Sequence, residues 1–156
     1  MKILSLMLVL MMLAPVAAKD SESAAKGRWK KWLRSMQQIE TRARGIEPIH
    51  LELQKQTSAQ HKEIVRRVEF LDNLVEKEVR PLYREISQYR DYPDGLATTH
   101  ELIRKAGEEL TNWTSAKLTL QNAGVNNPSL EALRRNEPKA YAEFQRAFQA
   151  AEAATR

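Results

Sequence analysis

Apolar residues return at steps of three and four along most of this 156-residue chain, and this spacing constrains its fold more than any other feature. The longest such seam contains Ile64, Val68, Leu71, Val75, Val79, Leu82, Ile86 and Tyr89. Residues at these steps share one face of an α-helix, which can be buried against other helices. Alternating β-branched runs are absent, and helix-forming residues such as Ala, Leu, Glu, Gln, Lys and Arg are abundant. The sequence therefore predicts an all-α fold.

Glycine, proline and capping residues divide the chain into predicted helices. We expect helices over residues 23–44, 48–89 and 98–122, then a short helix opened by Asn127-Pro128 and a last helix opened by Glu137-Pro138. Thr98 and Glu101 have the spacing of a capping box at the start of the third helix. Pro81 lacks an amide hydrogen and should kink or break the long second helix. The Ala-rich tail after Ala150 should fray.

The segment Tyr92-Pro93-Asp94-Gly95 is a strong turn signal between two long helical seams. We place the reversal of a helical hairpin near Tyr92–Gly95, with the terminal helices packed along the hairpin. This gives either an elongated helical hairpin or antiparallel coiled coil, or an irregular four- to five-helix bundle. Residues 54–62 are polar and can bury little, which favours the elongated form.

Residues 1–18 have the three parts of a secretory signal peptide: a basic start, a short apolar run and a small-residue end. Val16 and Ala18 suit the −3 and −1 positions, so we predict cleavage after Ala18. The apolar run is shorter than the roughly 20 residues that span a bilayer. An uncleaved membrane anchor is the rival interpretation. Residues 19–156 then form a single helical domain, which we expect in the periplasm or outside the cell.

The chain has no cysteine, so an exported form has no disulfide and must be stabilised by packing alone. This composition suits a bacterial periplasmic protein better than a small eukaryotic secreted domain. The formal net charge is +5. Residues 19–50 carry eight Lys and Arg against four Asp and Glu, whereas the rest of the domain is nearly balanced. The basic character therefore belongs to the first helix of the domain.

The sequence offers little catalytic or metal-binding chemistry. None of His50, His61 and His100 is four residues from another histidine, as two ligands on one helix face require. Glu47 and His50 form one ExxH unit, but a di-iron bundle needs a second unit and two further glutamates. We interpret the three histidines as surface or capping residues. Neither a nucleophile elbow nor a phosphate loop is present. We therefore expect a non-enzymatic protein without a metal or another cofactor.

The segment from Lys26 to Met36 combines a tryptophan-rich face with a cationic one. The candidate binding residues are Lys26, Arg28, Trp29, Lys30, Lys31, Trp32 and Arg34. Three interpretations compete. The helix could lie on an anionic membrane, or it could dock on an acidic protein with the tryptophans as anchors. In the third, Trp29, Trp32 and Met36 simply pack in the core while the lysines are solvated.

These features favour an exported, non-enzymatic interaction protein, such as a periplasmic adaptor or an assembly factor of an envelope or secretion machine. The alternatives are a holdase-type periplasmic chaperone and a membrane-anchored coiled-coil protein. The expected partners are proteins of the cell envelope, with peripheral contact to anionic membrane and self-association as further candidates. Nucleic acid is disfavoured because the basic segment is short and an exported protein rarely meets it.

Overall fold

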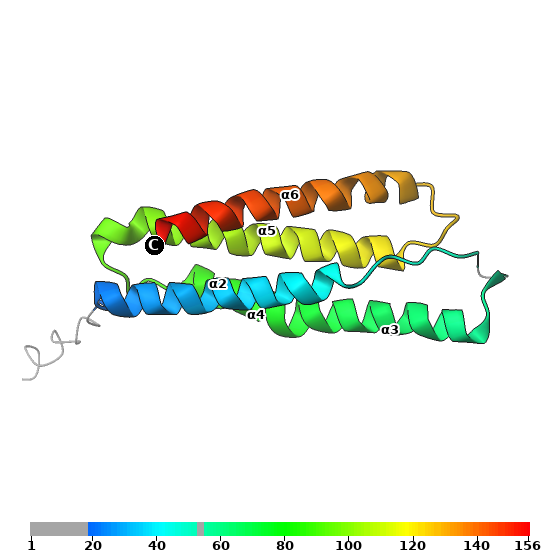
Figure 1. The fold of residues 1–156 in the computed structure, drawn as a ribbon, viewed down its shortest axis with the longest axis horizontal. Coiled ribbons are helices and arrows are strands. Elements are labelled where there is room, and N and C mark those ends of the chain that lie inside the picture. The colour runs from blue at the N-terminus through cyan, green and yellow to red at the C-terminus, as the bar shows by residue number, and fades with distance from the viewer. Residues whose placement is uncertain (1–18, 53–54) are drawn as a thin grey trace, which may run out of the picture.

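The computed structural model describes residues 19–52 and 55–156, so the predicted signal peptide lies outside the described residues. The long elements are α2 (Glu22–Arg44), α3 (Ser58–Leu74), α4 (Arg80–Gln88), α5 (Ala97–Asn122) and α6 (Leu130–Ala154). A π-helical turn, η2 (Val75–Val79), joins α3 to α4, and a 3-10 turn, η3 (Asp94–Leu96), precedes α5. Within the described residues there is no strand. The predicted all-α class is confirmed, in the form of an elongated helical bundle (Figure 1).

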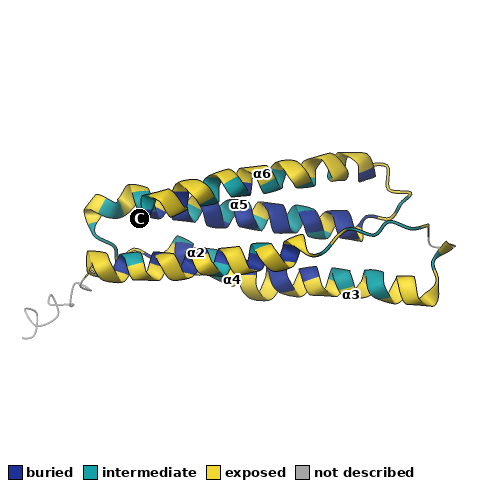
Figure 2. Ribbon diagram, in the orientation of Figure 1, coloured by how far each residue is buried: buried dark blue, intermediate teal, exposed yellow. Residues whose placement is uncertain are grey.

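The helix α5 is the centre of the packing, because it contacts α2, α3, α4 and α6. It lies alongside α6 for most of its length (Figure 1). Buried positions follow the inner faces of the helices, and the outer faces are exposed (Figure 2). The largest buried side chains of the main core are Trp29, Trp32, Met36, Leu74, Ile86, Ile103, Leu110, Trp113 and Phe144. Burial of each such side chain contributes about 1.5–3 kcal/mol, so packing can stabilise a chain without disulfides.

The rod formed by α3, η2 and α4 is interrupted where the sequence predicts a break. Pro81 lies in the first turn of α4, directly after the π-helical turn. The amide of Arg80 donates to the carbonyl of Val75, five residues back, instead of the usual four. This wider turn carries the chain past the missing donor of Pro81. It also explains why the apolar seam departs from a regular heptad after Val75.

The predicted start of the second helix at residue 48 is wrong, because α3 begins only at Ser58. Thr57 and Gln60 form a reciprocal capping box there, in which each side chain accepts a hydrogen bond from the other residue's backbone amide. The described residues between Gly45 and Thr57 instead form an irregular strap along the bundle (Figure 1). Hydrogen bonds to the end of α5, and one from Arg67 of α3 to the carbonyl of Glu47, fix this strap.

The two predicted C-terminal helices are one helix, α6, with Pro138 inside it. The proline removes the hydrogen bond to the carbonyl of Arg134, and its ring crowds that carbonyl. Both residues are exposed, so water can satisfy that carbonyl and the helix continues. The predicted fraying of the tail is also wrong. Ala151 is fully buried and Thr155 is only 3% exposed, so the end of α6 is packed against the bundle.

The predicted reversal near Tyr92–Gly95 matches the connection between α4 and α5, which contains η3. The predicted capping box at Thr98 is wrong. α5 begins at Ala97, directly after η3, and its N-cap residue Leu96 makes no capping hydrogen bond through its side chain. The preceding 3-10 turn leads straight into the helix, so no separate side-chain cap starts it.

Candidate binding groove between α2 and α6

The start of the described chain is clasped to the hairpin end of the bundle. Lys19 forms an ion pair with Asp94. The hydroxyl of Tyr89 donates to the carboxylate of Asp20 at 2.7 Å. We call Lys19 and Asp20 with these contacts the N-terminal clasp. Ser21 then caps α2 by accepting a hydrogen bond from the third residue beyond it. The clasp and the cap together fix where α2 begins and which face it turns inward.

The two tryptophans of the candidate segment are core residues. Trp29 is 0% exposed and Trp32 is 2% exposed. The Trp32 ring meets Tyr89 edge-on with centroids 5.4 Å apart, and its Nε1 donates to Glu85 at 3.0 Å. Trp29 lies beside His100 with centroids 6.4 Å apart. In this fold neither indole can anchor α2 to a membrane or a partner, so the packing interpretation holds for the tryptophans.

The five cations of the segment fall into two groups. Lys26 forms an ion pair with Glu22, and Arg28 forms one with Asp20. The other three are Lys30, Lys31 and Arg34. They are exposed, and none makes an ion pair or a side-chain hydrogen bond within the described part of the chain. The charges that remain available to a partner are therefore concentrated in one turn and a half of α2.

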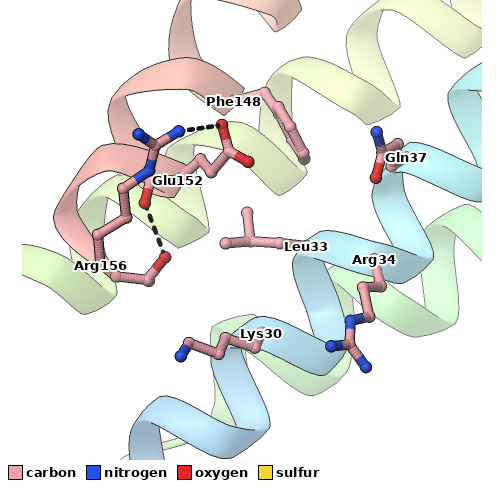
Figure 3. A pocket seen from close by; sticks show the side chains of 8 residues that line it. Lys30, Leu33, Arg34, Gln37, Phe148, Glu152 and Arg156 are labelled. Atoms are coloured by element: carbon pink, nitrogen blue, oxygen red, sulfur yellow. Dashed lines mark hydrogen bonds and ion pairs between the residues drawn. The ribbon is translucent and has the colours of Figure 1, made fainter.

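Two of these free cations border a groove between α2 and the end of α6 (Figure 3). The groove has a volume of about 220 Å³. Its lining residues are Lys30, Leu33, Arg34 and Gln37 from α2, with Phe148, Glu152, Thr155 and Arg156 from the C-terminal end. Leu33 and Phe148 present an apolar surface between the polar residues (Figure 3). The groove thus offers an apolar floor with a predominantly cationic rim.

The charged residues of the groove differ in whether a neighbouring side chain already neutralises their charge. Arg156 and Glu152 form an ion pair at 3.4 Å, drawn as a dashed line in Figure 3. Lys30 and Arg34 have no such partner in the described residues. An incoming carboxylate therefore meets two uncompensated positive charges on α2. Exposed charges of this kind steer a partner more than they tighten its binding.

The α6 side of the groove could not be recognised from the sequence. Phe148 belongs to an apolar face, and Glu152 and Arg156 have ordinary i, i+4 spacing. None of these signals says that α6 ends beside α2. The connection is made by long-range contacts: Glu40 of α2 accepts hydrogen bonds from the Tyr141 hydroxyl at 2.6 Å and from Gln145 at 3.0 Å. Burial and the bond to Glu40 raise the pKa of Tyr141 to about 12.

The three histidines differ in their exposure and in their hydrogen bonds. His61 is exposed, and His50 contacts the end of α5 through a hydrogen bond between Nδ1 and the carbonyl of Ala123. The prediction of a surface or capping position is wrong for His100, which is 3% exposed. Its Nε2 bonds the carbonyl of Ile86, and burial lowers its pKa. Among the described residues, no three His, Cys, Asp or Glu side chains gather as a metal site would require.

None of the described helices is both long enough and apolar enough to cross a bilayer. Comparison of the chain with protein-family models, with curated proteins and with solved structures finds no match.

Proposed function

We propose that this chain is an exported, non-enzymatic interaction protein, a periplasmic adaptor or assembly factor, that binds an acidic protein segment in the groove between α2 and α6. One observation carries the proposal. Lys30 and Arg34 are exposed cations without a described ion-pair partner, and they border the apolar surface formed by Leu33 and Phe148. This combination suits a segment that pairs carboxylates with one or two apolar side chains.

A protein partner fits this surface better than a membrane does. Interfacial helices use aromatic side chains at the headgroup level, and Trp29 and Trp32 are buried in the core. The remaining attraction to a lipid surface would be purely electrostatic. The groove is also concave, so inserted side chains can reach its apolar floor. A short acidic segment is therefore the preferred occupant.

Export is proposed from the signal-peptide pattern of residues 1–18. Lys19 is the first residue after the predicted cleavage point, and it forms an ion pair with Asp94. Cleavage after Ala18 would leave both members of the clasp on the domain. N-terminal sequencing of the native protein tests this step. A mature start at Lys19 is expected, whereas an intact Met1 would favour the membrane-anchored alternative.

The proposed partner can be identified by site-specific photo-crosslinking, with a photoreactive amino acid in place of Gln37, which lines the groove. We expect one stoichiometric partner whose crosslinked peptide is acidic. The double change Lys30→Glu and Arg34→Glu should weaken its binding by about tenfold, because two favourable contacts become repulsive. The matched control is Lys77→Glu with Lys139→Glu, which makes the same charge change at two exposed lysines without described ion pairs elsewhere in the fold.

Three results would contradict the proposal. Equal loss of binding in both double variants would mean that net charge, not the groove, attracts the partner. Saturable binding to anionic vesicles with the same dependence on Lys30 and Arg34 would favour the membrane. Suppression of the aggregation of unrelated unfolded proteins, without a stoichiometric partner, would favour the holdase-type chaperone.

A further inference from the structure

A second site lies at the opposite end of the bundle, where the strap crosses the end of α5 (Figure 1). The backbone amide of Ile49 donates to Gln121 Oε1 at 3.3 Å. The ring of His50 bonds the carbonyl of Ala123 through Nδ1 at 3.0 Å. These two bonds fix the orientation of the Gln121 amide and of the His50 imidazole. Each side chain has a second polar atom that takes no part in these bonds.

Both leftover atoms are buried, and neither has a hydrogen-bond partner among the described residues. They are His50 Nε2 and Gln121 Nε2, and Gln121 as a whole is only 2% exposed. Nδ1 of His50 faces a carbonyl, so we assign a proton to Nδ1. In the imidazole tautomer with that single proton, Nε2 is an acceptor. Gln121 Oε1 already accepts from Ile49, so its Nε2 is a donor. The two residues therefore leave one acceptor and one donor unused, an arrangement that native structures rarely tolerate.

These side chains line a cavity of about 100 Å³ between the strap, α3 and the end of α5. A larger hollow of about 580 Å³ adjoins it and shares Leu51, Gln56, Gly124 and Val125 with it. At roughly 30 Å³ for each water-sized group, the cavity has space for about three such groups. The cavity is thus the inner end of a larger depression rather than an isolated void.

The described residues that line both hollows are uncharged. Charged residues make up 29% of the chain, yet no described Asp, Glu, Lys or Arg lines either space. The polar lining residues are instead amides and one imidazole: His50, Gln56, Gln121, Asn122, Asn126 and Asn127. An anion would find no cation here, and a cation would find no carboxylate. The chemistry of the lining selects a neutral ligand with several hydrogen-bonding groups.

We propose that this end of the bundle binds a neutral polyhydroxylated ligand, a saccharide or a related polyol. One hydroxyl enters the inner cavity, accepts a hydrogen bond from Gln121 Nε2 and donates one to His50 Nε2. A hydroxyl has the donor and the acceptor that these two atoms lack. The rest of the ligand lies in the outer hollow beside the amides of Asn126 and Asn127. This site is separate from the groove between α2 and α6 and does not depend on it.

The test uses glucose as the probe on the full domain, followed by ¹H–¹⁵N correlation spectra. Glucose should shift the Gln121 side-chain amide and the Val125 backbone amide saturably. Gluconate and glucosamine, which are its charged analogues, should bind at least about tenfold more weakly. Absence of saturable shifts would mean that only water fills the cavity and would overturn the proposal. Equal binding of the charged analogues would overturn the assigned ligand class.

Three variants test the location of the ligand. Val125→Trp fills the space where the two hollows meet and should abolish the shifts of the Gln121 side chain, whereas Val65→Trp, at an exposed position of α3, should leave them unchanged. Asn126 is exposed, so Asn126→Asp should fold normally. It should raise the affinity for glucosamine relative to glucose, because it adds a carboxylate to the outer hollow. Unchanged relative affinity, or equal effects of both tryptophan variants, would overturn the location.

Discussion

The indoles of Trp29 and Trp32 differ in one respect that sets the stability of their phenylalanine variants. Trp29 is the more deeply buried, but its Nε1–H has no hydrogen-bond partner within residues 19–52 and 55–156. Trp32 donates its Nε1–H to Glu85. In either position, Trp→Phe removes apolar contacts worth roughly 1–2 kcal/mol. At Trp29 the change also removes an unpaired buried donor, whose burial costs about 1–3 kcal/mol. At Trp32 it also removes a hydrogen bond worth about 1 kcal/mol.

We therefore expect Trp29→Phe to be nearly neutral and Trp32→Phe to be the more destabilising by about 2–4 kcal/mol. Urea unfolding followed by far-UV circular dichroism measures this directly, and it does not depend on the fluorophore that is being replaced. With an m-value of about 2 kcal/mol/M, the unfolding midpoints of the two variants should differ by about 1–2 M. If Trp29→Phe is as destabilising as Trp32→Phe, packing rather than the missing hydrogen bond decides the stability at residue 29.

Three further predictions concern titration and packing. Burial and the hydrogen bond to Asp20 raise the pKa of Tyr89 to about 12, which favours the neutral phenol in the folded state. Stability should therefore fall as pH rises from 10 to 12, and Tyr89→Phe should flatten this fall in urea unfolding measured across that range. Burial lowers the pKa of His100, so protonation opposes folding and stability should decline as pH falls below about 6.5. Equilibrium unfolding of His100→Gln should show a weaker decline, and an unchanged one would contradict the assignment. A Cβ at Gly107 would lie 3.2 Å from Tyr83 Cδ2, so Gly107→Leu should lower the free energy of unfolding by about 1–3 kcal/mol through overpacking. A thermal unfolding midpoint equal to that of the parent chain would refute this.

The fold class and the main boundaries could be predicted because they depend on local signals. The predicted helix over residues 23–44 matches α2, and the predicted helix over 98–122 matches α5 to within one residue. The turn residues Tyr92–Gly95 likewise indicated where the chain leaves one helix and enters the next. In each case the apolar spacing and the neighbouring glycine or proline agree with the tertiary structure, so the local preference and the packing select the same boundary.

Prediction failed where distant contacts replace local ones. Glu47-Pro48 resembles a helix start, but the strap after it is fixed by Gln121 and Ala123, over seventy residues away along the chain. Pro138 resembles a helix boundary, but its exposed position allows α6 to continue. These outcomes depend on which backbone groups water or a remote side chain can satisfy, and no local pattern encodes that.

The candidate groove also combines features that the sequence could predict with features that depend on distant contacts. The cations of α2 were found from composition and spacing, and the pair of Lys26 with Glu22 has ordinary i, i+4 spacing. The ion pair of Arg28 could not be recognised in this way, because it depends on the position of Asp20 in the clasp. The tryptophans were identified as one face of a helix, and the structure places that face in the core.

The N-terminal clasp has a consequence for the order in which the chain can fold. Lys19 meets a partner 75 residues further along, and Asp20 meets one 69 residues further along. A chain that is synthesised from its N-terminus therefore completes α2 long before any residue that can cover it. Trp29 and Trp32 stay in contact with solvent until α4 and the reversal have emerged. The first helix to be made therefore stays exposed while later helices are synthesised. Its burial is completed only by α5 and α6, which follow the clasp partners Tyr89 and Asp94 in the chain.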